Sequence, residues 1–474
     1  MRQFFKSIRL SDFFLLGASL ISILVVIPSY PAFERHSLED VVMPIWISYL
    51  SFAVSIILWI IYVILEVRKG RFKIPPAVTV ISVVLLILNV ITIASQPEEI
   101  TVSAKIYNST FPNYNSYVDI TTVMPIDIKV FSIVQIITIL TVIYFLLFAL
   151  TTRFKKTYFI TFVGILFMIL GTVSILYSWF FEFHQYGPFL EGFFAPEFNL
   201  SLMHKNATKS FFMNKNAFAI ILFLSMMFMM INHSIYKRKF YYFFIALFYS
   251  EIFFTFSRTS YVFSSILLAL FFYFKLFDWF ERKALGITIT VFISALVAVG
   301  LTFLILYVPY VQTRFFTIFY SNGGTFSSRT LIWNHVTQIV KPSYWFFGRG
   351  YGVFNTILSQ VNRASFGGDG TVSAHSWFFS LLGKGGIFFV GTLLALSFSA
   401  LIFIFKYMKR NYTLMAVLLM SLLCTVGYCC FEDFHYIILL VVFVIFYMAY
   451  HFKTNPPQKP VNYTRIIVIN TYGY

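Results

Sequence analysis

The segment Pro309–Ser373 concentrates side chains that could bind an anion and assist a transfer reaction. Its five basic residues are opposed by one acid, Asp369, so its net charge is +4 (five minus one), and it leads directly into His375. The basic residues are Arg314, Arg329, Lys341, Arg349 and Arg363. Guanidinium groups bind phosphates and stabilise charge on a leaving group, and a neutral imidazole can remove a proton from a hydroxyl. A basic, irregular segment of this length requires a ligand or a partner.

The surrounding chain has the composition of a membrane protein. Of its 474 residues, 59% are hydrophobic and 11% are charged, whereas soluble domains average about 25% charged residues. Many apolar runs reach the roughly 20 residues with which a helix crosses a bilayer. We therefore predict an all-α polytopic membrane protein with about twelve transmembrane helices. The runs are 13–30, 41–65, 74–95, 128–151, 158–180, 211–232, 240–256, 260–275, 285–308, 386–405, 412–431 and 434–452.

Clusters of lysine and arginine fall between alternate spans, and the opposite loops are acidic apart from the large basic one. The positive-inside rule places the basic side, and with it both termini, in the cytoplasm. The chain then divides into four parts: 1–308 with the first nine spans, 309–375 as one large extracytoplasmic loop with short interfacial helices, 376–452 with the last three spans, and 453–474 as a cytoplasmic tail. Anionic lipid headgroups account for the cytoplasmic clusters. Nothing indicates nucleic acid.

Within the loop, residues Phe326–Val340 carry an apolar stripe at helical spacing and are followed by Pro342. They predict a helix that is too short and polar to span, and that lies on the membrane surface. Ser327 or Ser328 could cap it. We expect Arg329 in its first turn, where the guanidinium and the exposed N–H groups could hold a phosphate. The alternative is an interfacial arginine that only reaches toward water.

Three further arginines and a glycine-rich turn are weaker candidates. Residues Gly348–Gly352 could bring the backbone close to a ligand or could simply form a tight loop, because no strand precedes them as in a nucleotide site. Arg349 and Arg363 could bind an anion or be solvated loop charges. Arg314, at the end of a span, could also reach from the membrane to its surface.

His375 and Arg258 are the two sharpest single candidates. His375 precedes a short apolar helix that is interrupted at Gly383–Gly386. A histidine near a helix N-terminus is disfavoured as imidazolium, so it can act as a base; the alternative is an interfacial histidine that only packs. Arg258 lies in a tight turn, Thr255–Ser260, between two spans, where it could bind substrate or anchor the turn. Glu251 lies about two helical turns earlier and could share its face.

In this order, these segments resemble the O-antigen ligase and polymerase superfamily of bacterial membrane glycosyltransferases. The resemblance rests on four places: Phe211–Phe218 with Asn214, Lys215 and Asn216 at the start of a span, Phe256–Ser260 with the Ser-Arg turn, Arg329 with Trp333 followed by Gly348–Gly352, and Ala374–Trp377 with the histidine that closes the loop. Each motif alone is weak, but their order over about 175 residues is specific.

The resemblance implies glycosyl transfer at the outer face of a bacterial cytoplasmic membrane, from a substrate linked to undecaprenyl diphosphate. Arg258 and Arg329 would bind the diphosphate, and His375 would assist the acceptor hydroxyl. Asn214, Lys215 and Asn216 match the family at a substrate-binding position. Similar enzymes invert the anomeric centre, need no metal and use no cofactor.

Polymerase is the favoured activity, building a surface polysaccharide from repeat units, with a flippase and a chain-length regulator as partners. A ligase that moves finished glycan to another acceptor is the nearest alternative. A lipid-linked oligosaccharide transporter is less favoured, because Glu251 is nearly alone as a mid-membrane acid. Two residues depart from the family: Ser376 stands where relatives often have asparagine, and Lys384 where they often have an acid.

Overall fold

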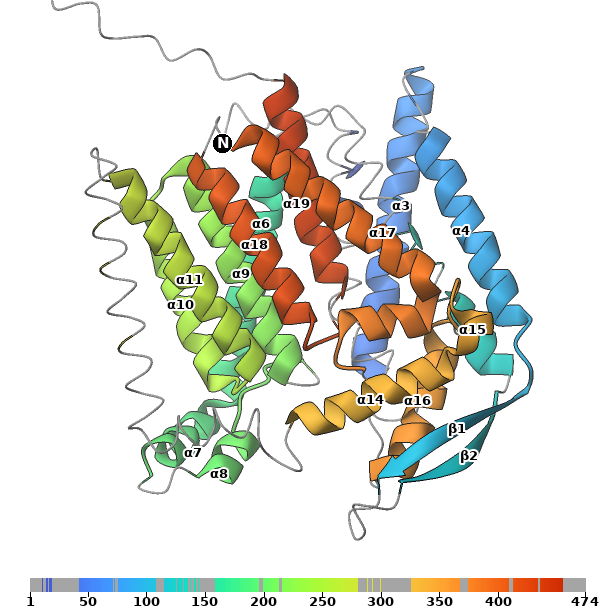
Figure 1. Ribbon diagram of the computed structural model, residues 1–474. Helices are drawn as coiled ribbons and strands as arrows, with labels where there is room; N and C mark the ends of the chain where they lie inside the picture. Colours follow the sequence, from blue (N-terminus) through green and yellow to red (C-terminus); the bar gives the residue numbers. More distant parts are fainter. Residues whose placement is uncertain are drawn as a thin grey trace, which may run out of the picture.

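The protein is a bundle of long helices. A helix pairs its own backbone N–H and C=O groups, which is necessary in the hydrocarbon core of a membrane because no water is available there. The computed structural model describes residues 42–70, 76–107, parts of 115–144, 158–195, 199–212, 215–279, 325–366, 374–408, 412–433 and 435–454, with a few isolated residues elsewhere. The long helices are α3 (Val42–Arg68), α4 (Pro76–Ala94), α6 (Tyr158–Phe181), α9 (Lys215–Tyr236), α10 (Phe240–Phe254), α11 (Arg258–Trp279), α17 (Trp377–Tyr407), α18 (Tyr412–Cys429) and α19 (His435–Thr454) (Figure 1).

Among the described residues, four helices are long and apolar enough to cross a membrane: α6, α9, α17 and α18. Helix α10 and parts of α4 and α19 are shorter apolar helices. The membrane character is therefore confirmed, whereas the predicted number of twelve spans is not. The predicted span at 285–308 and most of those at 13–30 and 128–151 lie outside the described residues.

Helix α9 forms the centre of the bundle. Every residue from Ala217 to Ser234 is buried, because α6, α10, α11 and α18 pack around it. Ser225 satisfies its hydroxyl within the core by donating to the carbonyls of Ile221 and Phe167, both at 2.7 Å. This packing fixes the start of α9, where Lys215 and Asn216 lie.

The shorter elements gather at one end of the bundle, the lower end in Figure 1. They are α7 (Phe183–Phe194), α8 (Leu200–Lys205), α14 (Thr325–Ile339), α15 (Lys341–Tyr344), α16 (Tyr351–Phe366) and the antiparallel strands β1 (Glu99–Tyr107) and β2 (Asn115–Val123). We call this the loop end. The turns between α10 and α11 and between α18 and α19 also belong to it.

The β1–β2 hairpin departs from the all-α prediction. Its strands pair with Glu99 opposite Val123 and Val102 opposite Ile120. Alternate residues turn inward: Ile100, Val102 and Thr122 are buried, as expected for a sheet with one covered face. The covered face packs on α14 and α16, so the hairpin supports the large loop.

Helix α14 confirms the helix predicted at Phe326–Val340, but it begins at Thr325. Ser327 and Ser328 therefore lie inside the first turn and cannot occupy the capping position before it. Arg329 is the fifth residue of the helix, beyond the first turn in which we had expected it. Arg329 therefore lies outside the turn whose free N–H groups were expected to hold a phosphate together with it.

The two glycine-rich segments, Gly348–Gly352 and Gly383–Gly386, pack against each other, and this close contact explains their glycines. The backbone N–H groups of Arg349 and Gly350 donate to the carbonyls of Gly383 and Lys384, each at 2.9 Å. Gly386 has a φ of 71° and marks the kink inside α17. A Cβ atom there would lie 2.3 Å from the backbone of Phe346. The turn at Gly348–Gly352 is therefore a tight loop contact, and the predicted interruption of the helix after His375 is confirmed.

Candidate active site

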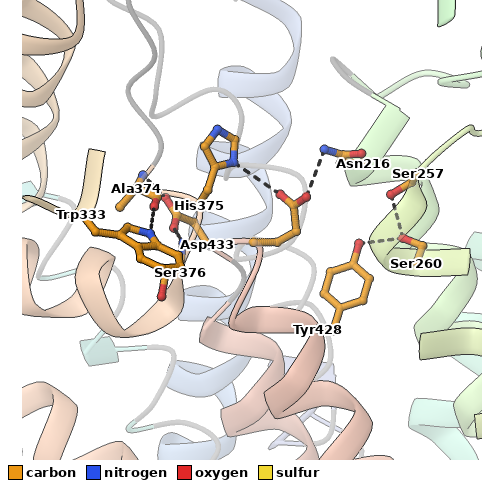
Figure 2. A network of polar contacts seen from close by, with 10 residues as sticks. Asn216, Ser257, Ser260, Trp333, Ala374, His375, Ser376, Tyr428 and Asp433 are labelled. Carbon is orange, nitrogen blue, oxygen red and sulfur yellow. Dashed lines mark hydrogen bonds and ion pairs between the residues drawn. The ribbon is translucent and has the colours of Figure 1, made fainter. Parts of the chain in front are cut away.

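Glu432 lies at the centre of the candidate site, in the turn between α18 and α19. Its Oε2 atom is 3.9 Å from Nδ1 of His375. Asn216, at the start of α9, donates from Nδ2 to its Oε1 atom at 3.4 Å (Figure 2). Arg329 on α14 also interacts with this carboxylate: burial lowers the pKa of the guanidinium, and the charge of Glu432 opposes that shift. One acid thus joins three residues predicted for the site from separate segments.

His375 is held in an unusual backbone conformation by the neighbouring acid. Its φ is +48°, a region that non-glycine residues rarely adopt. The Asp433 carboxylate accepts the N–H groups on either side of it, from Ala374 and from Ser376, both at 2.9 Å. Trp333 of α14 donates from Nε1 to the carbonyl of Ala374 at 2.9 Å. These three bonds fix the loop from both sides (Figure 2). The His375 side chain remains 30% exposed.

Asp433 itself is almost completely buried, at 1% exposure. Burial raises the pKa of its carboxyl to about 7, and the two backbone N–H groups counteract part of this rise. The carboxylate is therefore the form that the two donors favour, while the apolar surroundings favour the protonated form.

The tight turn predicted around Arg258 is confirmed. Helix α10 ends at Phe254 and α11 begins at Arg258, whose side chain is exposed. The hydroxyls of Ser257 and Ser260 are 3.0 Å apart, and Ser260 Oγ is 2.7 Å from the buried Tyr428 hydroxyl (Figure 2). Tyr428 lies on α18 one helical turn before Glu432. The turn with Arg258 is thereby tied to the segment that carries the central acid.

Lys215 and His204 lie beside the same turn, and both are near the Phe256 ring. Lys215 Nζ is 5.1 Å from the centroid of the Phe256 ring. The His204 ring centroid lies 6.3 Å from that of Phe256. The pKa of His204 is lowered, first by the positive charge of Lys215, then by burial, and then by Arg258. His204, Lys215 and Arg258 therefore lie close enough to interact electrostatically.

A buried carboxylate fixes the segment that leads into α9. Glu182 Oε2 accepts the backbone N–H groups of Lys209 and Ser210, at 3.2 and 2.9 Å. Ser210, with a φ of +56°, donates to the carbonyl of Ser174 at 2.7 Å. The Thr208 N–H donates to the carbonyl of Phe254 at 3.0 Å, at the end of α10. We call residues 208–212 the α9 strap, because they hold the start of α9 against α6 and α10.

Glu251 does not share a site with Arg258. It is buried at 3% exposure, where the Tyr186 hydroxyl bonds to it and Trp179 Nε1 donates to it at 3.3 Å. Tyr186 also lies 3.0 Å from Ser178 Oγ, which donates to Glu182. Glu251 therefore belongs to the polar network behind the α9 strap.

The remaining predicted residues fall into three groups. Arg349 is buried at 4% exposure. Its Nε donates to the Ile339 carbonyl at 2.7 Å, and its Cζ atom lies 3.8 Å from the centroid of the Tyr344 ring. We therefore assign Arg349 a structural role. Arg363 is exposed at the end of α16. Arg314 and Asn214 lie outside the described residues.

Sequence reasoning did not single out four side chains that the structure brings to the site or behind it: Glu432, Asp433, His204 and Glu182. The adjacent acids Glu432 and Asp433 directly follow an apolar run, and that position at the end of a span was the available signal. Lys384, which stands where the family often has an acid, is buried at 2% exposure. The acid beside His375 comes instead from the α18–α19 turn.

Comparison with known proteins found one matching family. Residues 241–394 match a protein-family model described as O-antigen ligase. This match over residues 241–394 supports the O-antigen ligase/polymerase superfamily of membrane proteins that transfer glycans. Searches of curated proteins and of solved structures gave no match. The matched stretch contains Arg258, Arg329 and His375, whereas Lys215, Asn216 and the two acids Glu432 and Asp433 lie outside it.

Proposed function

We propose that this protein is a polysaccharide polymerase of the bacterial cytoplasmic membrane. It transfers a growing glycan from undecaprenyl diphosphate to the next lipid-linked repeat unit, with the loop end facing outward and both termini in the cytoplasm. The observation that carries the proposal is the convergence of Asn216, Arg329 and His375 on Glu432, beside the cations Lys215 and Arg258. The proposed acid–base pair, His375 and Glu432, thus lies next to cations that could bind the diphosphate.

In the proposed reaction, the acceptor hydroxyl attacks the anomeric carbon and the bond from that carbon to the diphosphate oxygen breaks. His375 takes the hydroxyl proton, and Glu432 stabilises the imidazolium that forms. Arg258 and Arg329 neutralise the charge that develops on the leaving diphosphate. A single displacement of this kind inverts the anomeric centre. In this proposal His375 supplies the base, and Arg258 and Arg329 stabilise the leaving group in place of a metal ion.

The arrangement of charge supports transfer over transport. A transporter places ionisable side chains along a path near the middle of the membrane. Here His375, Glu432 and Asp433 lie together at the loop end. Glu251, near the end of α10, is engaged by Tyr186 and Trp179. A flippase and a chain-length regulator would be partners of the proposed polymerase, supplying its substrate and limiting its product.

A ligase is the second candidate, and the description of the matched family favours it. Both activities use the same donor and differ in the acceptor. Analysis of lipid-linked glycans in a deletion strain separates them. A polymerase predicts that single repeat units accumulate on undecaprenyl diphosphate. Accumulation of long lipid-linked polymer would instead establish the ligase.

A further inference from the structure

Helix α8 places a histidine beside the proposed diphosphate site, in a part of the chain outside the family match. His204 is exposed, and its ring centroid lies 6.3 Å from that of Phe256. Lys215 Nζ also lies near this ring, 5.1 Å from its centroid. Phe256 has a φ of +52° and directly precedes the Ser-Arg turn. The turn thus places the Phe256 ring near both Lys215 and His204, and Arg258 follows two residues later.

The charges in this group repel one another. Among the described residues, no carboxylate lies within ion-pair distance of Lys215 or His204. Lys215 is also the first residue of α9, where the helix dipole disfavours a cation and favours an anion. A group of positive side chains at such a position is stabilised when an anion binds between them.

The imidazole responds to this repulsion. The pKa of His204 is lowered by Lys215, by burial and by Arg258, in that order. Helix α7, which packs on α8, carries His184 and Glu191, both exposed, and neither is among these causes. A bound diphosphate would reverse the sign of the local potential and favour the imidazolium.

We propose that His204 is a third ligand of the lipid diphosphate, together with Lys215 and Arg258, and that it takes up a proton when the diphosphate binds. The inference rests on the proposed function and assigns one more residue to its donor site. The added N–H donor strengthens binding to the donor substrate. His204 contributes to binding, whereas His375 remains the base.

Isothermal titration calorimetry of the full-length protein in phosphatidylcholine nanodiscs tests this. The probe is P1,P2-dimethyl diphosphate, a diester with no ionisation of its own near neutral pH. Titrations in two buffers that differ in ionisation enthalpy measure the protons taken up. We expect uptake by the wild type, and an affinity that falls by up to about tenfold per pH unit as the histidine deprotonates. His204→Gln should abolish the uptake while retaining binding.

His184→Gln is the matched control, because it removes an exposed histidine at the same end of the bundle and should leave the uptake unchanged. Full uptake in His204→Gln, no uptake in the wild type, or loss of uptake only in His375→Gln would each overturn the assignment. A chain-extension assay on the same preparations separates this inference from the proposed function. Extension without proton uptake rejects only the role of His204, whereas absence of both extension and diphosphate binding in the wild type rejects the proposed function as well.

Discussion

The Glu432 carboxylate lies 3.9 Å from Nδ1 of His375 and joins the end of α18 to the segment that closes the large loop. The same carboxylate accepts a hydrogen bond from Asn216 on the central helix α9. A base that becomes an imidazolium during transfer is stabilised by an acid in this position. The pair therefore accounts for how a partly exposed histidine could act as a base where the expected acid is replaced by Lys384.

Replacing this acid should impair transfer without removing the donor site. We expect Glu432→Gln to lower kcat by about 10- to 100-fold, because the imidazolium loses its counter-charge. The KM for the lipid-linked donor should change less. Glu191→Gln removes an exposed acid on α7 and is the control. Steady-state chain extension with purified protein measures both constants, and an unchanged kcat in Glu432→Gln would exclude the pair from the mechanism.

Asp433 should give the protein opposite pH responses in activity and stability. Its pKa is raised to about 7, so the folded protein binds this proton more tightly than the unfolded chain does. Its contribution to stability is therefore present at low pH and is lost as pH rises through about 7. Activity should rise over the same range, because the ionised carboxylate accepts both N–H groups that flank His375.

Asp433→Asn tests this response, since an amide cannot ionise and can accept only through its oxygen. We expect low activity with a flatter pH profile. Its thermal unfolding midpoint should also change less than that of the wild type between about pH 5 and pH 8. Chain extension and thermal unfolding across this range provide the two readouts. Wild-type pH dependence in the variant would assign the titration to another group.

The α9 strap should affect donor binding more than the chemical step. Glu182→Ala removes the acceptor of the Lys209 and Ser210 N–H groups, and we expect the KM for the lipid-linked donor to rise by about 3- to 10-fold as Lys215 and Asn216 lose their fixed position. Glu182→Gln keeps one acceptor oxygen and should recover part of the effect. A change in kcat alone would show that the strap acts in some other way.

Gly386 should be essential for the contact between the two glycine-rich segments. Gly386→Ala places a Cβ atom 2.3 Å from the Phe346 backbone at a φ of +71°, so we expect a loss of stability of about 1–3 kcal/mol or more. Gly391→Ala is the matched control in the same helix, since its added Cβ meets open space. A thermal midpoint equal to the wild type in Gly386→Ala would contradict the observed packing.

Local patterns in the sequence were sufficient to predict the long apolar helices, the tight turn at Arg258 and helix α14. These features depend on apolar run length, helical spacing and breaks at glycine or proline, all of which are readable within about 20 residues. The hairpin was missed because its strands are only half apolar and become stable by packing on α14 and α16. Propensity alone does not reveal such tertiary support.

The candidate site was predicted only in part, for the same physical reason. Arg258, Arg329 and His375 stood out because charged groups are costly near a membrane. Their partners Glu432, Asp433 and Tyr428 come from the end of α18 and beyond it, and only the folded bundle brings them to the loop. Arg349 shows the reverse case: its charge indicated a ligand, but the fold buries it against Tyr344 and the Ile339 carbonyl.

The most direct test of the proposed function is chain extension by purified protein supplied with undecaprenyl-diphosphate-linked repeat units. Arg258→Ala, Arg329→Ala and His375→Ala should each reduce extension by at least about 100-fold while the protein stays folded. Lys341→Ala, which removes an exposed cation from α15, should retain it. Wild-type extension in any of the first three variants would remove that residue from the mechanism, and wild-type protein that extends no chain would contradict the account as a whole.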